Sequence, residues 1–441
     1  MTPARAIGIR NLSGKPTRLG ILGTVSASRS GSARAQLVKL LVLVAFALCM
    51  SALEEVFYTR VESELNPLVG VMKLALLGVS FAILLLCRTR KHHWALAGPF
   101  WLLIAWAAIC WIVSGTEMLP ARNLVSSFGG ILVLAALCAA VEYVGGIGGM
   151  VRLLVWALVL TALTSVFLGI SGLQAMPGEL ASPTQLEWFH GIGLPSYMLA
   201  GCASLIAWVL GRYLSGPGVW LEPAVVLLLV LPALSFLRAY LIGIAVSIML
   251  AAFVAARHSF LNRDHSVQTY DPGYKRLLLL VTVTLVLGAA VFLLKTSTRL
   301  EGEELSGREI IWPIEIASVI QNPVFGLGPF GDIELLRFKE DLPQVGSAHS
   351  EYLAAAVCYG LPGLFLFVAA LFTMWRRVLR YPAVSLEERS CRYAAMFSLA
   401  GLSTTIIAEN VIRDPRLFSL HLLFPALCLS AAALHQEKAA R

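Results

Sequence analysis

The residues of this chain best suited to chemistry lie in one polar stretch between hydrophobic segments, residues 307–363. Arg308 stands near its beginning, with Trp312 four positions later, and His349 stands at the start of the next apolar run. A guanidinium group can bind phosphate through two parallel hydrogen bonds. An imidazole with a pKa near neutrality can accept a proton. The stretch therefore predicts a site for anion binding and proton transfer.

Hydrophobic residues make up 58% of the 441 residues and charged residues only 14%, which excludes an ordinary soluble domain. The apolar runs are long enough to cross a bilayer as helices of about 20 residues. We expect an all-α membrane protein of about twelve transmembrane helices, with a long periplasmic loop that contains short surface helices. The expected spans are 37–53, 67–87, 95–114, 123–141, 151–172, 192–211, 219–235, 238–256, 276–294, 350–374, 393–408 and 417–434.

The net charge of +8 could indicate a nucleic-acid partner, but its distribution argues against one. With twelve spans both termini lie on one side, and the loops on that side hold 22 of the 34 Lys and Arg residues, against 10 in the other loops. Basic loops stay in the cytoplasm, so both termini are predicted to be cytoplasmic. The basic surplus thus reports the topology of the chain, and it adds a weak attraction to anionic membrane lipid.

This topology divides the chain into five parts. We expect a disordered cytoplasmic tail over 1–36, nine transmembrane helices over 37–294, and a catalytic loop on the periplasmic side over 295–349. Three further spans fill 350–434, and 435–441 form a second cytoplasmic tail. All eight cysteines lie within spans or at their inner ends, so no disulfide framework is predicted.

Within the loop, the spacing of apolar residues predicts a short helix on the membrane surface. It runs from Arg308 to Gln321 and stops at Asn322-Pro323. The following Gly326-Leu327-Gly328-Pro329-Phe330-Gly331 matches the spacing of a dinucleotide-binding loop. No strand precedes it, a proline lies inside it, and nucleotides are scarce outside the membrane, so a tight backbone turn is the better interpretation.

A synthetic reaction on the outer face needs a donor that carries its own leaving group, and a lipid diphosphate is the obvious type. Arginines near that face would hold it: Arg122, Arg238, Arg299, Arg308, Arg413 and Arg416. Arg238 is the clearest candidate because almost no loop separates its two spans. A snorkelling arginine at the interface is its alternative. Asp414 could pair with Arg413 or Arg416 and so account for one of them.

Only His190 and His349 among the eight histidines fall on the outer face. His349 is the preferred general base by position, and Glu351 could orient its imidazole or serve as a solvated cap of the next helix. No pair of potential ligands has a recognisable metal-binding spacing, so neither a metal nor another cofactor is predicted.

Four features in order make the chain resemble the O-antigen ligase and polymerase superfamily of bacterial inner-membrane glycosyltransferases. They are Arg238 at an outer span start, the helix with Arg308 and Trp312, the turn Asn322–Gly328, and His349-Ser350 followed by Gly360-x-x-Gly363. One departure is that Phe236-Leu237 replaces the Ser or Thr followed by Ser that often precedes the span arginine in this family.

The resemblance implies transfer of O-antigen from an undecaprenyl diphosphate carrier to a lipid A–core acceptor. It implies that His349 acts on the acceptor hydroxyl and that Arg238 and Arg308 bind the diphosphate, with Arg122 and Arg413 as weaker candidates for that role. Glu351 and Trp312 would support them. A base acting in direct displacement predicts inversion at the anomeric carbon without a metal ion.

Three alternatives stay open at this point. A polymerase of O-antigen or exopolysaccharide repeat units would share the pattern and use a growing glycan as acceptor. A secondary transporter would need ionisable residues near the bilayer centre and repeat symmetry, neither of which is visible. A structural or sensory protein would need a signalling domain, and the sequence shows none.

The charge count leads to a direct test of topology. Reporters fused after Arg90, Glu304 and Arg389 should report cytoplasmic, periplasmic and cytoplasmic locations, because basic loops are retained inside. A cytoplasmic location for Glu304 would contradict every assignment to the outer face.

Overall fold

The computed structural model describes residues 32–51, 67–114, 120–170, 196–216, 228, 238–261, 279–280, 282–286, 308–336, 350–409, 411 and 414–439. These residues form helices and turns, with no strand among them. The helices are α2 (Ala33–Met50), α4 (Pro67–Leu86), η1 (Lys91–Trp94), α5 (Ala97–Ser114), α6 (Pro120–Val144), α7 (Gly146–Ile170), α9 (Ser196–Ser215), α11 (Arg238–Leu261), α13 (Arg308–Gln321), α14 (Gly331–Glu334), α15 (Glu351–Arg380), α16 (Leu386–Thr405), α17 (Pro415–His421) and α18 (Leu423–Ala439).

The expected all-helical class is confirmed for this part of the chain, but twelve spans are not. Six described helices are long and apolar enough to cross a membrane, namely α2, α5, α7, α9, α11 and α15. The expected span 417–434 is instead the pair α17 and α18, bent by 62° at Leu422. Counting that pair gives up to seven. The expected spans 219–235 and 276–294 lie almost wholly outside the described residues.

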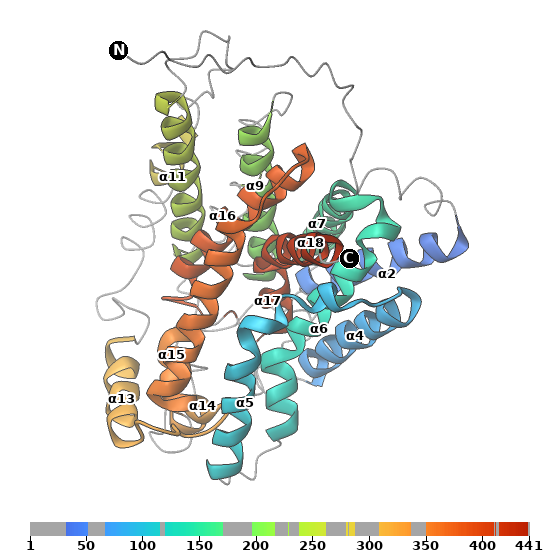
Figure 1. Cartoon of the computed structure of the whole chain (residues 1–441). Coiled ribbons are helices and arrows are strands. Elements are labelled where there is room, and N and C mark those ends of the chain that lie inside the picture. Colours follow the sequence, from blue (N-terminus) through green and yellow to red (C-terminus); the bar gives the residue numbers. More distant parts are fainter. Residues whose placement is uncertain are drawn as a thin grey trace, which may run out of the picture.

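Helix α16 runs through the middle of the bundle and contacts α9, α11, α15 and α18 (Figure 1). It begins with a capping box, because Ser385 accepts from the Glu388 N–H while the Glu388 carboxylate accepts from the Ser385 N–H. Glu388 lies in the first turn of α16 and Thr405 is its last residue, so we call the two ends of the bundle the Glu388 end and the Thr405 end.

Close helix contacts depend on small residues, as they do in membrane bundles generally. Gly243 of α11 and Gly401 of α16 face each other: a Cβ on Gly243 would lie 2.9 Å from the Gly401 carbonyl oxygen. A Cβ on Gly211 of α9 would lie 2.5 Å from the Ser390 carbonyl oxygen. The backbone of α16 therefore lies directly against α11 and α9.

Polar contacts gather at both ends. At the Glu388 end, the His435 imidazole lies 3.1 Å from the Glu388 carboxylate, and the Gly148 N–H donates to Glu387 at 2.6 Å. At the Thr405 end, Lys73 and Arg416 contact Asp414. At the Glu388 end, each contact joins two segments that the charge count predicts to be cytoplasmic.

Candidate functional site

The structure describes the framework around the predicted site more fully than the predicted side chains themselves. His349 and Arg413 lie outside the described residues. Helices α6, α11 and α13 include Arg122, Arg238 and Arg308, but the side chains of these three arginines are also outside the described part. Glu351 and Trp312 are described. The roles of all seven stay predictions, and the described geometry concerns the backbone that carries them.

The start of α11 and the start of α15 meet at one point, the C-terminal end of α16. The Glu351 N–H donates to the Ile406 carbonyl at 3.0 Å. The Thr405 hydroxyl makes a long hydrogen bond of 3.5 Å to the Ala239 carbonyl. Ala239 directly follows Arg238 in the chain, and Glu351 is two positions after His349. Thr405, the last residue of α16, and Ile406, its C-cap, thus hold chain neighbours of both predicted catalytic residues.

Glu351 is buried in the first turn of α15. A carboxylate there stabilises the helix through its interaction with the positive end of the helix dipole. The alternative prediction, a solvated cap of this helix, is wrong about solvation, because Glu351 is only 5% exposed. The first turn of α15 is therefore a fixed element of the bundle rather than a frayed helix end.

Helix α15 is broken at Gly360, which has a φ of 68°, and Pro362 follows inside the same helix. A break of this kind leaves backbone groups without their usual helical partners. The Leu361 N–H no longer reaches Val357 but donates to the Pro323 carbonyl at 2.8 Å. Pro362 has no N–H to offer Cys358. The carbonyls of Val357 and Cys358 therefore need other donors.

The turn after α13 supplies those donors. The Leu327 N–H donates to the Val357 carbonyl at 2.8 Å, and the Gly328 N–H donates to the Cys358 carbonyl at 2.9 Å. Together with the Leu361 bond, these contacts join residues 323–328 to the break in α15. We call this arrangement the backbone latch. It explains why one sequence segment contains both the turn Asn322–Gly328 and the Gly-x-x-Gly pattern.

Two glycines of the latch cannot be replaced without moving backbone. Gly326 has a φ of 65°, and a Cβ there would lie 2.5 Å from the Val357 carbonyl oxygen. Gly360 also has a positive φ, and a Cβ on it would collide with the Val324 carbonyl. Only glycine combines a left-handed conformation with so close an approach. The predicted backbone turn, rather than a nucleotide loop, agrees with this geometry.

Side chains from α5 and α14 also contact the latch. The Trp106 indole of α5 donates to the Tyr359 carbonyl at 2.8 Å, and its ring stacks on Phe325 with centroids 5.5 Å apart. On the other side, the Cys358 thiol donates to the fully buried Asp332 carboxylate at 3.3 Å. The latch therefore connects α5, α13, α14 and α15.

The predicted helix from Arg308 to Gln321 is confirmed as α13, and it ends directly before Asn322-Pro323. Glu315 and Ser318 are buried, whereas Ile310, Ile316 and Ile320 are at least half exposed. A helix with its isoleucines outward is typical of one in contact with lipid. Figure 1 shows α13 beside α15, with which it is in contact. Trp312 is partly buried on this helix.

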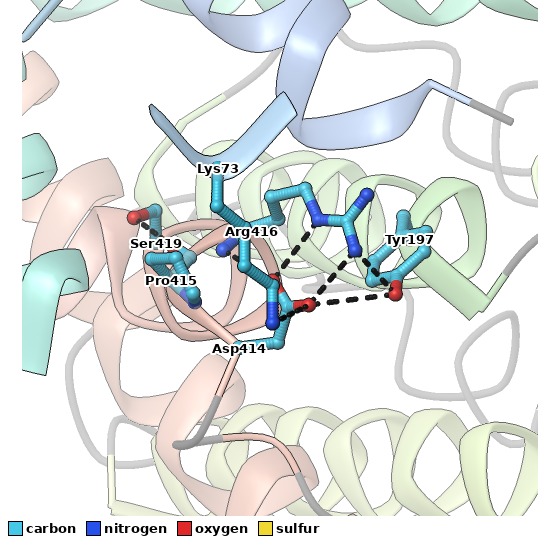
Figure 2. Close-up of polar contacts among 6 residues, drawn as sticks. All are labelled: Lys73, Tyr197, Asp414, Pro415, Arg416 and Ser419. Carbon is cyan, nitrogen blue, oxygen red and sulfur yellow. Dashed lines mark hydrogen bonds and ion pairs between the residues drawn. The ribbon is translucent and has the colours of Figure 1, made fainter. Parts of the chain in front are cut away.

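A buried charged cluster at the Thr405 end was only partly predicted (Figure 2). Asp414 caps α17 by accepting from the Arg416 N–H at 2.8 Å. The Arg416 guanidinium donates to both Asp414 oxygens, from Nε at 3.1 Å and from Nη2 at 2.9 Å. Nη2 also donates to the Tyr197 hydroxyl at 2.6 Å, and the guanidinium lies 3.8 Å from the centroid of the Tyr197 ring. Lys73 Nζ lies 3.4 Å from Asp414.

The expected local pair of Asp414 with a neighbouring arginine is thus confirmed for Arg416, which is fully buried. This leaves Arg416 in a structural role between α9 and α17. The participation of Lys73 and Tyr197 was missed. A lysine within an apolar helix is itself the signal, since such a charge requires a buried partner, but the sequence does not say which acid provides it.

Opposing effects act on the pKa of Asp414. Burial alone would raise it, but the Arg416 guanidinium and the Lys73 ammonium outweigh burial and hold the pKa well below its usual range. Asp414 is therefore ionised at any physiological pH. The carboxylate joins α4, α9 and α17 permanently rather than as a switch.

Among the described residues, no group of three or more His, Cys, Asp or Glu side chains could hold a metal ion.

Comparison with known proteins assigns the region of the latch to a family. Residues 223–368, about a third of the chain, match the family model described as O-Antigen ligase. This confirms the resemblance drawn from the sequence, and the match includes α11, α13, α14 and the start of α15 with its break. None of the curated proteins matches the chain.

The latch predicts a strong effect of two small substitutions. Gly326→Ala and Gly360→Ala should each lower the thermal midpoint, because either Cβ forces the turn away from α15. Gly78→Ala in α4 is a matched control, since its Cβ would meet open space. Thermal unfolding of the purified variants provides the measurement. Midpoints equal to that of Gly78→Ala would contradict the latch.

The charged cluster predicts a graded loss of stability. Asp414→Asn keeps a capping side chain but removes the negative charge beside Arg416 and Lys73, and breaking a buried pair in this way costs about 3–5 kcal/mol. Tyr197→Phe removes one hydroxyl and should cost about 1 kcal/mol. Glu437→Gln, at a partly exposed pair with His92, should change little. Unfolding in denaturant would rank the three variants by their loss in free energy of unfolding. A loss in Asp414→Asn no larger than that in Glu437→Gln would show that the Asp414 charge is not required.

Proposed function

We propose, from the premise that residues 223–368 are an O-antigen ligase domain, that this protein is a membrane glycosyltransferase that uses a lipid-linked donor. In this proposal it transfers a saccharide from undecaprenyl diphosphate to a sugar hydroxyl such as one on lipid A–core. The reaction takes place at the periplasmic face of the bacterial inner membrane. The observation that carries the proposal is the family match itself, which includes Arg238, Arg308 and His349.

The chemistry follows from these three residues. The guanidinium groups of Arg238 and Arg308 bind the diphosphate and stabilise the charge that develops as it leaves. His349 accepts the proton of the acceptor hydroxyl. The acceptor oxygen then forms a bond to the anomeric carbon while the bond from that carbon to the phosphate oxygen breaks. The electron pair leaves with undecaprenyl diphosphate, and the anomeric carbon is inverted.

The described framework supports this arrangement. The end of α16 holds Ala239 and Glu351, so the helices that follow Arg238 and His349 start side by side. The backbone latch fixes α13, which begins at Arg308, against α15. Catalytic groups need supports of this rigidity, because a displacement of about 1 Å can cost a factor of roughly 10² in rate. The exposed isoleucines of α13 suit a helix beside the lipid chains.

The acceptor distinguishes a ligase from a polymerase within the same chemistry. A ligase transfers to lipid A–core, and a repeat-unit polymerase transfers to a growing glycan. Purified protein offered the same labelled donor with each acceptor in turn would separate these two forms of the proposal. Product on the lipid acceptor alone is the expected result.

The proposed roles of the histidine and the arginine are tested together in that assay. His349→Ala should lose about 10²–10⁴ in rate because the positioned base is missing, while donor binding persists. Arg238→Ala should lose donor binding, with partial recovery in Arg238→Lys, since lysine lacks the planar guanidinium. The wild-type rate should fall as the pH drops through the imidazole pKa, nominally about 6.5.

The control is His190→Gln, which changes the other histidine predicted outside the membrane and should leave the rate near that of the wild type. His349→Gln is the deciding variant, because glutamine replaces a hydrogen-bond donor but not a base. A near-normal rate and an unchanged pH profile in His349→Gln would refute general-base catalysis by His349. Full activity of Arg238→Ala would likewise remove that arginine from donor binding.

A further inference from the structure

A small polar cavity lies within the bundle, between α9, α11, α16 and α17. Six polar side chains line it: Ser204, Tyr240, Ser247, Ser398, Thr405 and His421. The volume open to the centre of a water molecule is about 10 Å³, which is close to the threshold at which a cavity holds one water molecule.

Two of the lining side chains are buried without a hydrogen bond to the described part of the chain. The two atoms are the hydroxyl oxygen of Ser398 and Nε2 of His421. Ser398 is 7% exposed and His421 is 4% exposed. An unsatisfied buried polar atom costs about 1–3 kcal/mol, and two at one cavity are rare in stable proteins. Both atoms therefore require a hydrogen-bond partner small enough to fit in the cavity.

The other hydroxyls are arranged to complete such a partner's hydrogen bonds. Ser204 donates to the Leu420 carbonyl at 2.5 Å, and Ser247 donates to the Phe397 carbonyl at 2.9 Å. Because these protons are already used, the lone pairs of both oxygens are left to accept. A water molecule needs two to four polar partners, and this lining offers that number.

We infer that this cavity binds one water molecule, held by Ser398 and His421 and completed by the neighbouring serine hydroxyls. The water joins α16 to the last residue of α17, beside the bend between α17 and α18. His421 also stacks on Tyr240 of α11, with ring centroids 5.7 Å apart. Tyr240 is two positions after Arg238, so the water stabilises the part of the bundle in which α11 begins.

The sign of a stability change tests this inference. If the cavity holds water, Ser398→Ala removes one of its partners and should lower the thermal midpoint by about 1–2 °C. If the cavity is dry, the same substitution removes an unsatisfied hydroxyl and should raise the midpoint. Ser403→Ala on the same helix is the matched control, because its hydroxyl donates only to the Leu399 carbonyl of α16. The change in Ser398→Ala is measured relative to this control.

A second variant and a direct observation complete the test. His421→Phe keeps a ring beside Tyr240 but removes both nitrogens, so it should also lower the midpoint if water is bound. A midpoint that rises or stays unchanged in Ser398→Ala would overturn the inference. So would a structure that resolves other internal waters but has no density between Ser398 and His421. The inference does not depend on the proposed transfer reaction, so failure of the transfer assay leaves it standing.

Discussion

The rest of the structure depends on one constraint, which is that backbone polar groups inside a membrane bundle must find partners within the protein. Helix α15 loses its regular backbone hydrogen bonds at Gly360 and Pro362. Backbone groups left without partners would carry a large free-energy cost in lipid. The turn of residues 323–328 removes that cost by supplying two N–H donors and one carbonyl acceptor. A broken helix and a surface turn thereby become one rigid unit.

The same requirement explains the Thr405 end of the bundle. Lys73 and Arg416 are charges in an apolar environment, and Asp414 neutralises part of that charge while it caps α17. Thr405 and Ile406 use the free end of α16 to hold the starts of α11 and α15. The water-sized cavity lies beside these contacts. Fixed charge, free helix ends and one internal water would together make this end of the described bundle rigid.

Sequence reasoning succeeded where the signal was local. The start and end of α13 followed from apolar spacing and from Asn322-Pro323. A pair of Asp414 with one of its two neighbouring arginines followed from their closeness in the chain, and the structure shows that Arg416 makes it. It did not anticipate the 62° bend at Leu422 in the last expected span, because such a bend leaves no mark in a continuously apolar segment. It also missed Lys73, whose partner is more than three hundred positions away in the chain.

The sequence by itself determined the all-helical membrane class and the family resemblance, and it supplied the candidates for phosphate binding and proton transfer. These features follow from composition, periodicity and short motifs, which act within a few residues. Only the tertiary structure decided what the glycines of the motif do and which acid meets Lys73. It also decided which helices start beside one another. Those outcomes depend on backbone groups and charges from distant segments, and their pairing is fixed by burial in the folded bundle rather than by neighbours in the chain.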